Sequence, residues 1–310
     1  MKYAIISDIH GNIHAFKAVI ADAKNQGADA YLLLGDYTNS FPYGNDVVEN
    51  IRKLKPVVAV RGNGEEYLMN LQGRSLSKLT DEQFKPVYWS YQTLAPKNFE
   101  YLASLPETAV ISECNTKIYL AHSMSLFYRT PEIKLFRSHH FSAIMNEKPF
   151  THKEYLFRAR EALLSCPEAM SEMMRLPKDI YIFGHNHLQF HMEYDGRLFI
   201  NPGSCGEPLD CDTRAAYTLL TIEKSGRAVT ERRVKYDLES VADGLTASGF
   251  SAYAPMWSKI MKLEIFTGKD YFLPFVIHLT KTGHKMGLAE FPVNNDIWMA
   301  AVRTWDADKI

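Results

Sequence analysis

The sequence predicts an α/β fold whose strands are buried in parallel sheets. Short apolar runs alternate with amphipathic segments, and the first three runs each end at a glycine together with an aspartate or asparagine. Apolar runs of this length bounded by Gly are typical of parallel strands that are covered on both faces. Ligands of such sheets bind beyond the carboxyl ends of the strands, so polar residues at those ends are the first candidates for a functional site.

Strands and helices alternate at the start of the chain, and strands dominate further on. Strands are expected at 3–6, 30–34, 57–60, 108–111, 117–121, 180–183, 189–194, 197–200, 216–222 and 229–236. Helices at 14–26 and about 46–54 make the first part a right-handed βαβαβ unit, and a helical pattern runs from about 64 to 105. The Asp195-Gly196 pair favours a tight hairpin turn.

The chain divides into a main domain with an insertion and a C-terminal appendage. The strand pattern ends near residue 238, so we expect a main domain at 1–238 and a helical appendage at 239–310. An insertion at about 123–178 interrupts the main domain and has a helical pattern from about 153 to 175. The appendage is rich in aromatic residues, which predicts a packed core or a contact in a dimer.

The composition is that of an ordinary globular protein. Hydrophobic residues make up 46% of the 310 residues and charged residues 23%. A formal net charge of -1 gives no global attraction to nucleic acid or to an anionic membrane. No apolar stretch reaches the roughly 20 residues of a membrane span, and the N-terminus lacks an export signal. With four irregularly spaced cysteines, these features predict a cytoplasmic protein with reduced thiols.

Potential metal ligands stand at the ends of successive strands. They are Asp8, His10, Asp36, Asn63, His122, His185 and His187. Taken singly, each has an ordinary explanation, because an Asp can cap a helix, an Asn can form a turn and a His can satisfy hydrogen bonds in a core. Seven such residues at consecutive strand ends are hard to explain in that way. Oxygen and nitrogen donors in this number suit two borderline metal ions that share a carboxylate and leave positions for water and substrate.

The order of these residues resembles the calcineurin-like metallophosphoesterase superfamily. The family pattern runs Asp-x-His, Gly-Asp, Gly-Asn-His-Glu/Asp, a lone His and Gly-His-x-His. This chain has Ser7-Asp8-Ile9-His10, Gly35-Asp36, Gly62-Asn63-Gly64-Glu65, Ala121-His122 and Gly184-His185-Asn186-His187. Asn201-Pro202-Gly203-Ser204 also looks like the small bacterial and archaeal phosphodiesterase branch. The resemblance covers about residues 1–237, interrupted by the insertion, and implies an αββα sandwich with mixed sheets.

The resemblance also implies a ligand set for two metal ions. One ion would be held by Asp8, His10, Asp36 and His187, and the other by Asp36, Asn63, His122 and His185, with Asp36 bridging. It makes Asp36, Asn63 and His122 the candidate catalytic residues. The expected ions are Mn or Fe, with Zn or Ni as alternatives, in divalent or mixed-valence form. Such a pair activates water and neutralises the phosphoryl oxygens of a phosphoester.

One position departs from the family pattern. In the family's third motif, Gly-Asn-His-Glu/Asp, the histidine is thought to stabilise the transition state or protonate the leaving oxygen. Gly64 replaces this histidine here. A positioned general acid contributes about 10²–10⁴-fold, so esters with poor leaving groups should suffer most. We also expect the missing side chain to open space beside the metals for a bulkier diester. Alternatively, Gly64 only eases a turn and a protonated group from elsewhere substitutes. Glu65 is expected to be a first-turn helix charge and not that acid.

The insertion offers candidate substrate-binding residues. Arg129 and Arg137 stand among aromatic residues soon after His122, as in a lid that presents Arg to a phosphate and aromatics to a base. A solvated loop with apolar anchors would have the same pattern. His139 and His140 match no ligand position of the family and are excluded from the metal site.

These observations favour a phosphodiesterase with a dinuclear metal centre and weak monoesterase activity. The enzymatic alternatives are a phosphomonoesterase and a dinucleoside polyphosphate hydrolase, and the alternative of another class is a non-catalytic scaffold, against which the intact ligand positions argue. The expected partner is a small phosphoester. No membrane partner is expected, nucleic acid is disfavoured by the near-neutral charge, and a homo-oligomer is compatible with the sequence.

Overall fold

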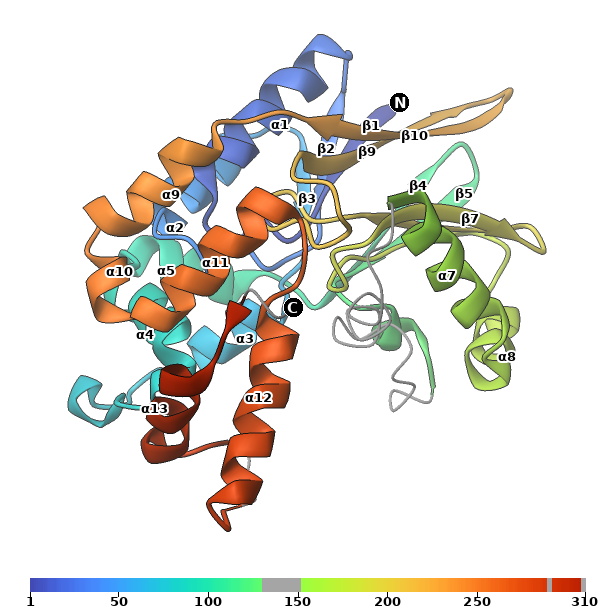
Figure 1. The fold of residues 1–310 in the computed structure, drawn as a ribbon. Coiled ribbons are helices and arrows are strands. Elements are labelled where there is room, and N and C mark those ends of the chain that lie inside the picture. The colour runs from blue at the N-terminus through green and yellow to red at the C-terminus, as the bar shows by residue number, and fades with distance from the viewer. Residues whose placement is uncertain (130–151, 289–291, 308–310) are drawn as a thin grey trace.

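Two mixed β-sheets packed face to face form the centre of the molecule, with helices on both outer sides (Figure 1). The computed structural model describes residues 1–129, 152–288 and 292–307. The strand order is β10-β9-β1-β2-β3 in one sheet and β4-β5-β6-β8-β7 in the other. This arrangement confirms the predicted αββα sandwich and the helical character of the C-terminal part.

The first sheet is built around the predicted βαβαβ unit. Its parallel strands are β1 (Lys2–Ile6), β2 (Ala30–Leu33) and β3 (Val57–Ala59), and their crossovers are α1 (Ile13–Asn25) and α2 (Gly44–Ile51). Tyr3 pairs with Ala30, and Tyr31 pairs with Val57. β9 (Ala215–Glu223) pairs antiparallel with β1, and β10 (Gly226–Val234) pairs antiparallel with β9. The carboxyl ends of β1, β2 and β3 therefore meet at one edge.

The second sheet has a parallel centre and antiparallel edges. Its strands are β4 (Thr108–Glu113), β5 (Thr116–Ala121), β6 (Ile180–Ile182), β8 (Arg197–Pro202) and β7 (Gln189–Tyr194), with β5, β6 and β8 parallel. The insertion supplies η3 (Met124–Phe127), α7 (His152–Leu164) and α8 (Pro167–Arg175). α8 packs on the outer face of this sheet, because Met173 lies in one buried cluster with Tyr181 and Phe199.

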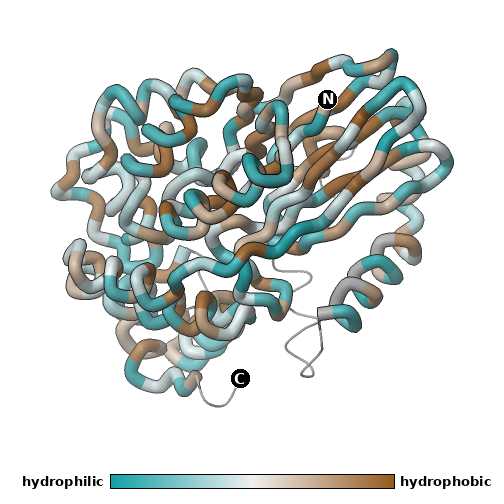
Figure 2. Tube along the Cα trace, turned by 90° about the horizontal axis from the view of Figure 1, so that it is seen from above, coloured by the Kyte–Doolittle hydropathy of each residue, from teal (hydrophilic) through white to brown (hydrophobic). Residues whose placement is uncertain are grey.

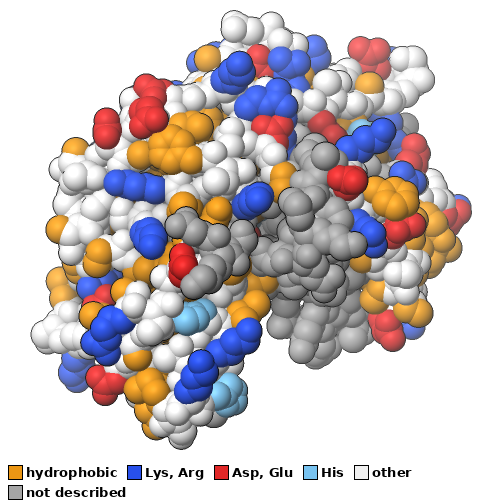
Figure 3. Space-filling view, viewed as in Figure 1, with side chains coloured by type: hydrophobic (Ala, Val, Ile, Leu, Met, Phe, Trp, Pro, Cys, Tyr) orange, Lys and Arg blue, Asp and Glu red, His pale blue; other side chains and the backbone are white. Residues whose placement is uncertain are grey.

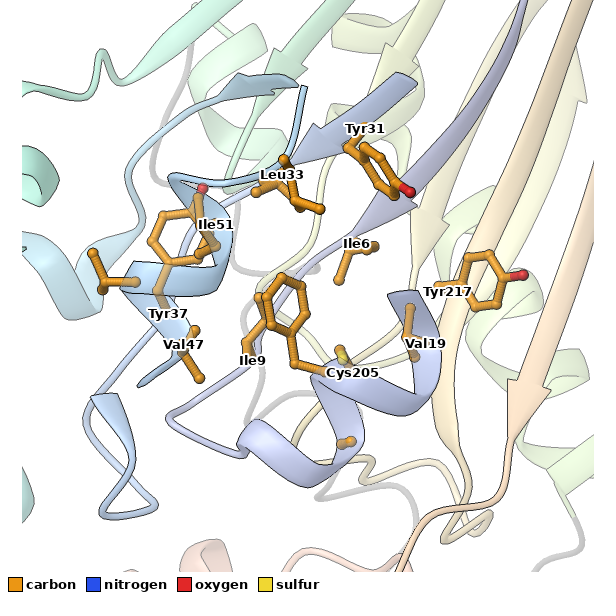
Figure 4. Packing of buried hydrophobic residues seen from close by; sticks show 14 of the residues in the cluster. Ile6, Ile9, Val19, Tyr31, Leu33, Tyr37, Val47, Ile51, Cys205 and Tyr217 are labelled. Carbon is orange, nitrogen blue, oxygen red and sulfur yellow. The ribbon is translucent and has the colours of Figure 1, made fainter. Parts of the chain in front are cut away.

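Alternate residues of the central strands face different apolar layers. Tyr3 and Ile5 of β1 belong to the cluster between the two sheets, whereas Ala4 and Ile6 belong to the cluster under α1 and α2. Figure 4 shows Ile6 in this outer layer together with Val19 of α1, and Figure 2 shows hydrophobic residues along the strands. Strands covered on both faces explain why the sequence shows continuous apolar runs.

Helices from two parts of the chain meet beside the sandwich (Figure 1). The residues after β3 form α3 (Asn63–Met69), η1 (Leu76–Lys78), η2 (Glu82–Phe84), α4 (Lys85–Thr93) and α5 (Pro96–Ser104). The C-terminal part forms α9 (Leu238–Ala247), α10 (Phe250–Tyr253), α11 (Pro255–Thr267), α12 (Phe272–Lys285) and α13 (Asn295–Thr304). The Trp89 and Phe250 rings, 5.5 Å apart, join α4 to α10.

The aromatic residues of the C-terminal helices pack against one another. The Trp257 ring stacks on Phe272 and Trp298, with ring centroids 5.0 and 5.8 Å apart. Phe275 packs edge-on against Trp298 and Trp305 at 5.1 and 5.2 Å. The prediction of a packed core is confirmed for these residues. A dimer contact stays a prediction.

The described surface carries charges of both signs, and the cysteines are not paired in disulfides. In Figure 3, acidic and basic side chains are interspersed over the described part of one face. None of the helices in the described ranges is both long enough and apolar enough to cross a membrane. The four cysteines are free, and Cys205 is a fully buried member of the core under α1.

Candidate metal centre

Both sheets bring the predicted ligands to one point. The loops after β1, β2 and β3 and those after β5 and β6 carry Asp8, His10, Asp36, Asn63, His122, His185 and His187. Backbone hydrogen bonds join neighbouring loops, because the Asp8 N–H donates to the Gly35 carbonyl and the Gly184 N–H donates to the His122 carbonyl. The ligand loops therefore hold one another in place without the side chains.

The first group of ligand atoms consists of Asp8, His10 and His187. The Nε2 atoms of His10 and His187 are 3.1 Å apart. Asp8 Oδ1 lies 3.4 Å from His187 Nε2 and 3.9 Å from His10 Nε2. Asp8 is fully buried, so this carboxylate meets little water.

The second group consists of Asp36, His122 and His185. His122 Nε2 lies 3.4 Å from Asp36 Oδ2 and 3.2 Å from His185 Nδ1. Asn63 belongs with this group, since its Oδ1 is 3.0 Å from His122 Nε2. The structure thus gathers the side chains predicted for the second ion, and their role as ligands stays a prediction.

Asp36 stands between the two groups. Its Oδ2 is 3.4 Å from His122 Nε2 in one group and 4.0 Å from His10 Nε2 in the other. Its other oxygen, Oδ1, accepts a hydrogen bond of 2.7 Å from the Gly64 N–H. This orientation is the one that a bridging carboxylate needs.

The donor atoms fit metal ions. Metal–ligand distances of about 2.1 Å put neighbouring ligand atoms roughly 3.0–3.4 Å apart, which is close to the separations within each group. His122 and His187 place their Nδ1 atoms 2.8 and 2.6 Å from the carbonyls of Leu34 and Glu207. When Nδ1 carries the proton, each Nε2 lone pair points into the site. Asp8 Oδ1 is buried and has no hydrogen-bond partner among the described residues, so a cation would satisfy it.

The site sets opposite charges against each other. Burial alone would raise the pKa of Asp8, but the facing His187 lowers that pKa to about 2. Burial opposes the charged form of His122, and Asp36 outweighs it and raises the pKa of His122 to about 10. Burial and the neighbouring His122 lower the pKa of His185 to about 4. Asp8 is therefore ionised and His185 neutral at pH 7, as metal binding requires, whereas His122 must exchange its proton for a cation.

Five of the seven predicted ligands have a left-handed backbone. Their φ angles are 53° for Asp8, 51° for His10, 52° for Asp36, 74° for His185 and 56° for His187. This conformation is uncommon for residues other than Gly and is enriched at functional sites. Glycine is needed beside them at Gly62, where a Cβ atom would lie 2.2 Å from Asp36 Oδ1.

Glu65 holds the Asp36 loop in place. Its Oε2 accepts hydrogen bonds from the N–H groups of Asp36 and Gly62 at 2.9 and 2.8 Å, and its Oε1 accepts one from Tyr37 at 2.9 Å. Burial, and then the nearby Asp36, raise the pKa of Glu65 to about 7. The expected first-turn position in α3 is correct, but Glu65 is 1% exposed and supports the loop instead of acting as a surface charge.

Sequence comparison identifies the family of this fold. A sequence profile of the calcineurin-like phosphoesterase superfamily domain matches residues 1–225. The chain belongs to this superfamily. The uncharacterized protein MJ0912 of Methanocaldococcus jannaschii is 26% identical over 251 residues, which cover 76% of this chain and 88% of that protein.

Solved structures share the fold of this calcineurin-like phosphoesterase. A metallophosphoesterase from Sphaerobacter thermophilus has a TM-score of 0.60 and 23% identity, covering 86% of this chain and 99% of that one. The hypothetical protein PH1004 from Pyrococcus horikoshii has a TM-score of 0.58 and 18% identity, covering 87% and 99%. At these identities the likeness shows the fold. The profile match ends at residue 225, so α9 to α13 lie beyond it.

Asn39 lies beside Gly64 in this phosphoesterase, and the opening of space by the missing side chain stays a prediction. A Cβ atom at Gly64 would lie 2.7 Å from Asn39 Nδ2 and 3.0 Å from Asp36 Oδ1. Asn39 Nδ2 is buried, and no described residue accepts a hydrogen bond from it. The Asn39 backbone has a φ of 88° and its N–H donates to Ser90 Oγ at 3.1 Å. A neutral N–H donor therefore occupies the place where the family histidine would begin.

A cavity of about 650 Å³ opens from the metal centre. His10, Asp36, Asn63, His185 and His187 line one end. Its other described walls come from α3, η2, α4, α11 and α12. The sequence does not predict this surface because its residues form no motif, although Asn39 stands only three residues after Asp36.

Arg129, one of the two predicted substrate-binding arginines, does not line the described part of this cavity. The Arg129 side chain is exposed, its backbone N–H donates to Glu172 Oε2 at 3.1 Å, and it is not among the described residues lining the cavity. Arg137, like His139 and His140, lies outside the described residues. The cation that does line the described part of the cavity is Arg74, after α3.

Proposed function

We propose that this protein is a cytoplasmic enzyme that hydrolyses phosphodiesters at a dinuclear metal centre and acts weakly on monoesters. The observation that supports this most strongly is the convergence of two groups of ligand atoms on either side of Asp36. Two cations bound there, Mn or Fe with Zn or Ni as alternatives, would supply Lewis acidity and activate a water molecule.

The protein's own part is to hold ligands and substrate in fixed positions. The Leu34 and Glu207 carbonyls orient the His122 and His187 rings, and Glu65 fixes the Asp36 loop. Such supporting contacts typically matter by about 10–100-fold in metal affinity or activity. Asn63 turns its Oδ1 toward the second group, so its role is that of a ligand and not of a proton donor.

Asn39 and Gly64 support the preference for diesters. Asn39, the side chain beside Gly64, is an amide and cannot release a proton. Gly64 offers no side-chain acid either, so the leaving oxygen receives less help than a histidine would give. A monoester adds a second negative charge to a cavity that already holds carboxylates, which disfavours it further.

The experiment is a comparison of matched aryl esters. Protein stripped of metal and reloaded with Mn²⁺ or Fe²⁺ should cleave bis(p-nitrophenyl) phosphate faster than p-nitrophenyl phosphate, and metal analysis should find two ions per chain. Equal or reversed rates would contradict the diester preference. Inactivity toward both esters with two ions bound would contradict hydrolysis itself.

A further inference from the structure

We propose that α11, α12 and η2 form the pocket for the alcohol part of the substrate, and that this part is apolar or aromatic and carries no negative charge of its own. The proposal rests on the proposed function and adds the substrate class. Trp257, Met261 and Phe272 lie beyond the family-matched residues, yet they line the same cavity as His10 and Asp36. The C-terminal helices thus reach the reacting centre.

The size and lining of the cavity fit an organic group. Its volume of about 650 Å³ lies within the range of about 300–1,000 Å³ that is typical of small-molecule sites and far exceeds the need of a phosphate alone. Aromatic rings stand on both sides, with Phe84 and Tyr88 facing the cavity from η2 and α4 and Trp257 and Phe272 from α11 and α12. The Phe84 side chain is 36% exposed, which leaves ring surface for a ligand.

One hydrogen bond joins the two walls, and three more tie η2 to the chain at the start of α13. Trp257 Nε1–H donates to the Glu82 carbonyl at 3.0 Å. Gln83 makes a reciprocal pair with Val293, since its Nε2 donates to the Val293 carbonyl at 2.6 Å and its Oε1 accepts from the Val293 N–H at 3.2 Å. Asn295 Oδ1 accepts from the Glu82 N–H at 2.9 Å. A pocket held in this way is formed before the substrate arrives, which lowers the entropic cost of binding.

The charge of the pocket excludes a second anionic group. Beyond Asp36, the carboxyl groups that line the described cavity are Asp81, Glu207, Glu264 and Asp270, whereas Arg74 is the one Lys or Arg. Glu207 and Asp270 are buried, so the field of these two carboxylates is poorly screened by solvent. The phosphoryl charge belongs at the metal ligands, and an alcohol group with further phosphates or carboxylates would be repelled by the rest of the cavity.

Binding of unreactive or slowly reacting diesters tests the pocket directly. The probes are diphenyl phosphate and dimethyl phosphate, titrated calorimetrically into the metal-loaded protein. Both have one negative charge, so they differ in apolar surface. Burying an aromatic ring should make diphenyl phosphate bind about 10- to 100-fold more tightly. Equal affinities would overturn the proposal.

Variants locate the binding surface. Phe84→Ala should weaken diphenyl phosphate about 10-fold and leave dimethyl phosphate unchanged. The matched control is Phe266→Ala, because Phe266 is 42% exposed on α11 but lines a separate surface depression. Phe272→Ala on the opposite wall should repeat the Phe84 result, and thermal melts would show that each variant is folded. Indistinguishable affinities of the Phe84 and Phe266 variants would refute the assigned surface.

A charged probe tests the second half of the proposal. A diphenyl phosphate with one ring carboxylated at the para position should bind at least about 10-fold more weakly than the parent. Equal or tighter binding would refute the exclusion of negative charge. These affinities separate the two proposals. If the protein binds diphenyl phosphate through Phe84 but hydrolyses no diester, the pocket is supported and the proposed function is contradicted.

Discussion

The metal centre and the far wall of the cavity are built in opposite ways. Each candidate ligand directly follows a strand or starts a helix, and backbone hydrogen bonds join the loops that carry them. The far wall is assembled from helices that lie far apart in the sequence, and side-chain contacts such as Trp257 to Glu82 hold it together. The first region determines the chemistry, whereas the second selects among substrates that this chemistry could attack. Changes in the centre should therefore lower turnover, and changes in the wall should alter binding.

The largest effect is expected for Asp36→Asn. A neutral amide oxygen is a weaker bridge than the charged Oδ2, and with that oxygen in the Oδ2 position the amide NH2 group would face the Gly64 N–H, from which it cannot accept a hydrogen bond. Activity should therefore fall by more than about 100-fold, beyond the range typical of merely supporting residues. Metal analysis should find fewer than two ions per chain. Glu193→Gln, a change at an exposed strand carboxylate, is the control. Full activity of Asp36→Asn would contradict the bridging role predicted for Asp36.

A pair of substitutions tests the Asn39 and Gly64 arrangement. Gly64→His alone should not restore monoesterase activity, because its Cβ would lie 2.7 Å from Asn39 Nδ2. The double variant with Asn39→Gly frees that space and also relieves the φ of 88°, so monoesterase activity should rise by about 10²-fold. Asn39→Gly alone is the control and should leave monoesterase activity low, because it adds no acid. A rise with Gly64→His alone would show that Asn39 moves aside.

Glu65→Gln should lower the stability of the protein by removing hydrogen bonds that hold the Asp36 loop. The amide NH2 group cannot accept, so at least one of the N–H groups of Asp36, Gly62 and Tyr37 loses its partner. We expect a loss of about 1–3 kcal/mol in the free energy of unfolding, measured with urea. Glu66→Gln, at the next and exposed residue, should change stability little. Similar values for the two variants would contradict the supporting role of Glu65.

Glu264 should make stability pH-dependent. Burial, followed by Glu207 and Asp270, raises the pKa of Glu264 well above its ordinary value of 4.5. Below pH 4.5 the carboxyl is protonated in both states, and as pH rises toward the folded-state pKa the unfolded chain loses the proton first, so stability falls. Glu264→Gln keeps an acceptor for Tyr271 and Phe272 and should be more stable than the parent above pH 7 by on the order of 1 kcal/mol.

Unfolding at pH 5 and pH 8 measures this difference. The difference in the free energy of unfolding between the parent and Glu264→Gln should be larger at pH 8 than at pH 5. Glu239→Gln, on the exposed face of α9, should show the same small difference at both values. A constant gap for Glu264→Gln would show that its carboxyl titrates normally.

The chain's local patterns were enough to predict the sandwich and the meeting of the ligands. Asp8 and His185 could be found because parallel strands fix where their carboxyl ends point, and a residue just after a strand inherits that position. The helical spacing of apolar residues predicted a helix at 14–26, within one residue at each end of the observed α1, Ile13–Asn25.

What the sequence did not predict depends on contacts between distant residues. The position of Asn39 beside Gly64 depends on a separation of a few ångströms between two loops, which no sequence pattern records. The role of Glu65 had a detectable signal, since a Glu three residues after Gly62 matches part of a capping box. The pocket of Phe84 and Trp257 joins residues with no shared motif, so only the folded chain reveals it.

The left-handed backbone of five ligands bears on how this protein could change over generations. Each such residue costs on the order of 1 kcal/mol relative to a glycine in the same place. In a lineage that no longer needed metal, replacing Asp8, His10 or His187 with glycine would relieve this strain and could raise stability. The strained backbone is thus a stability cost that this protein carries for keeping its ligands in place.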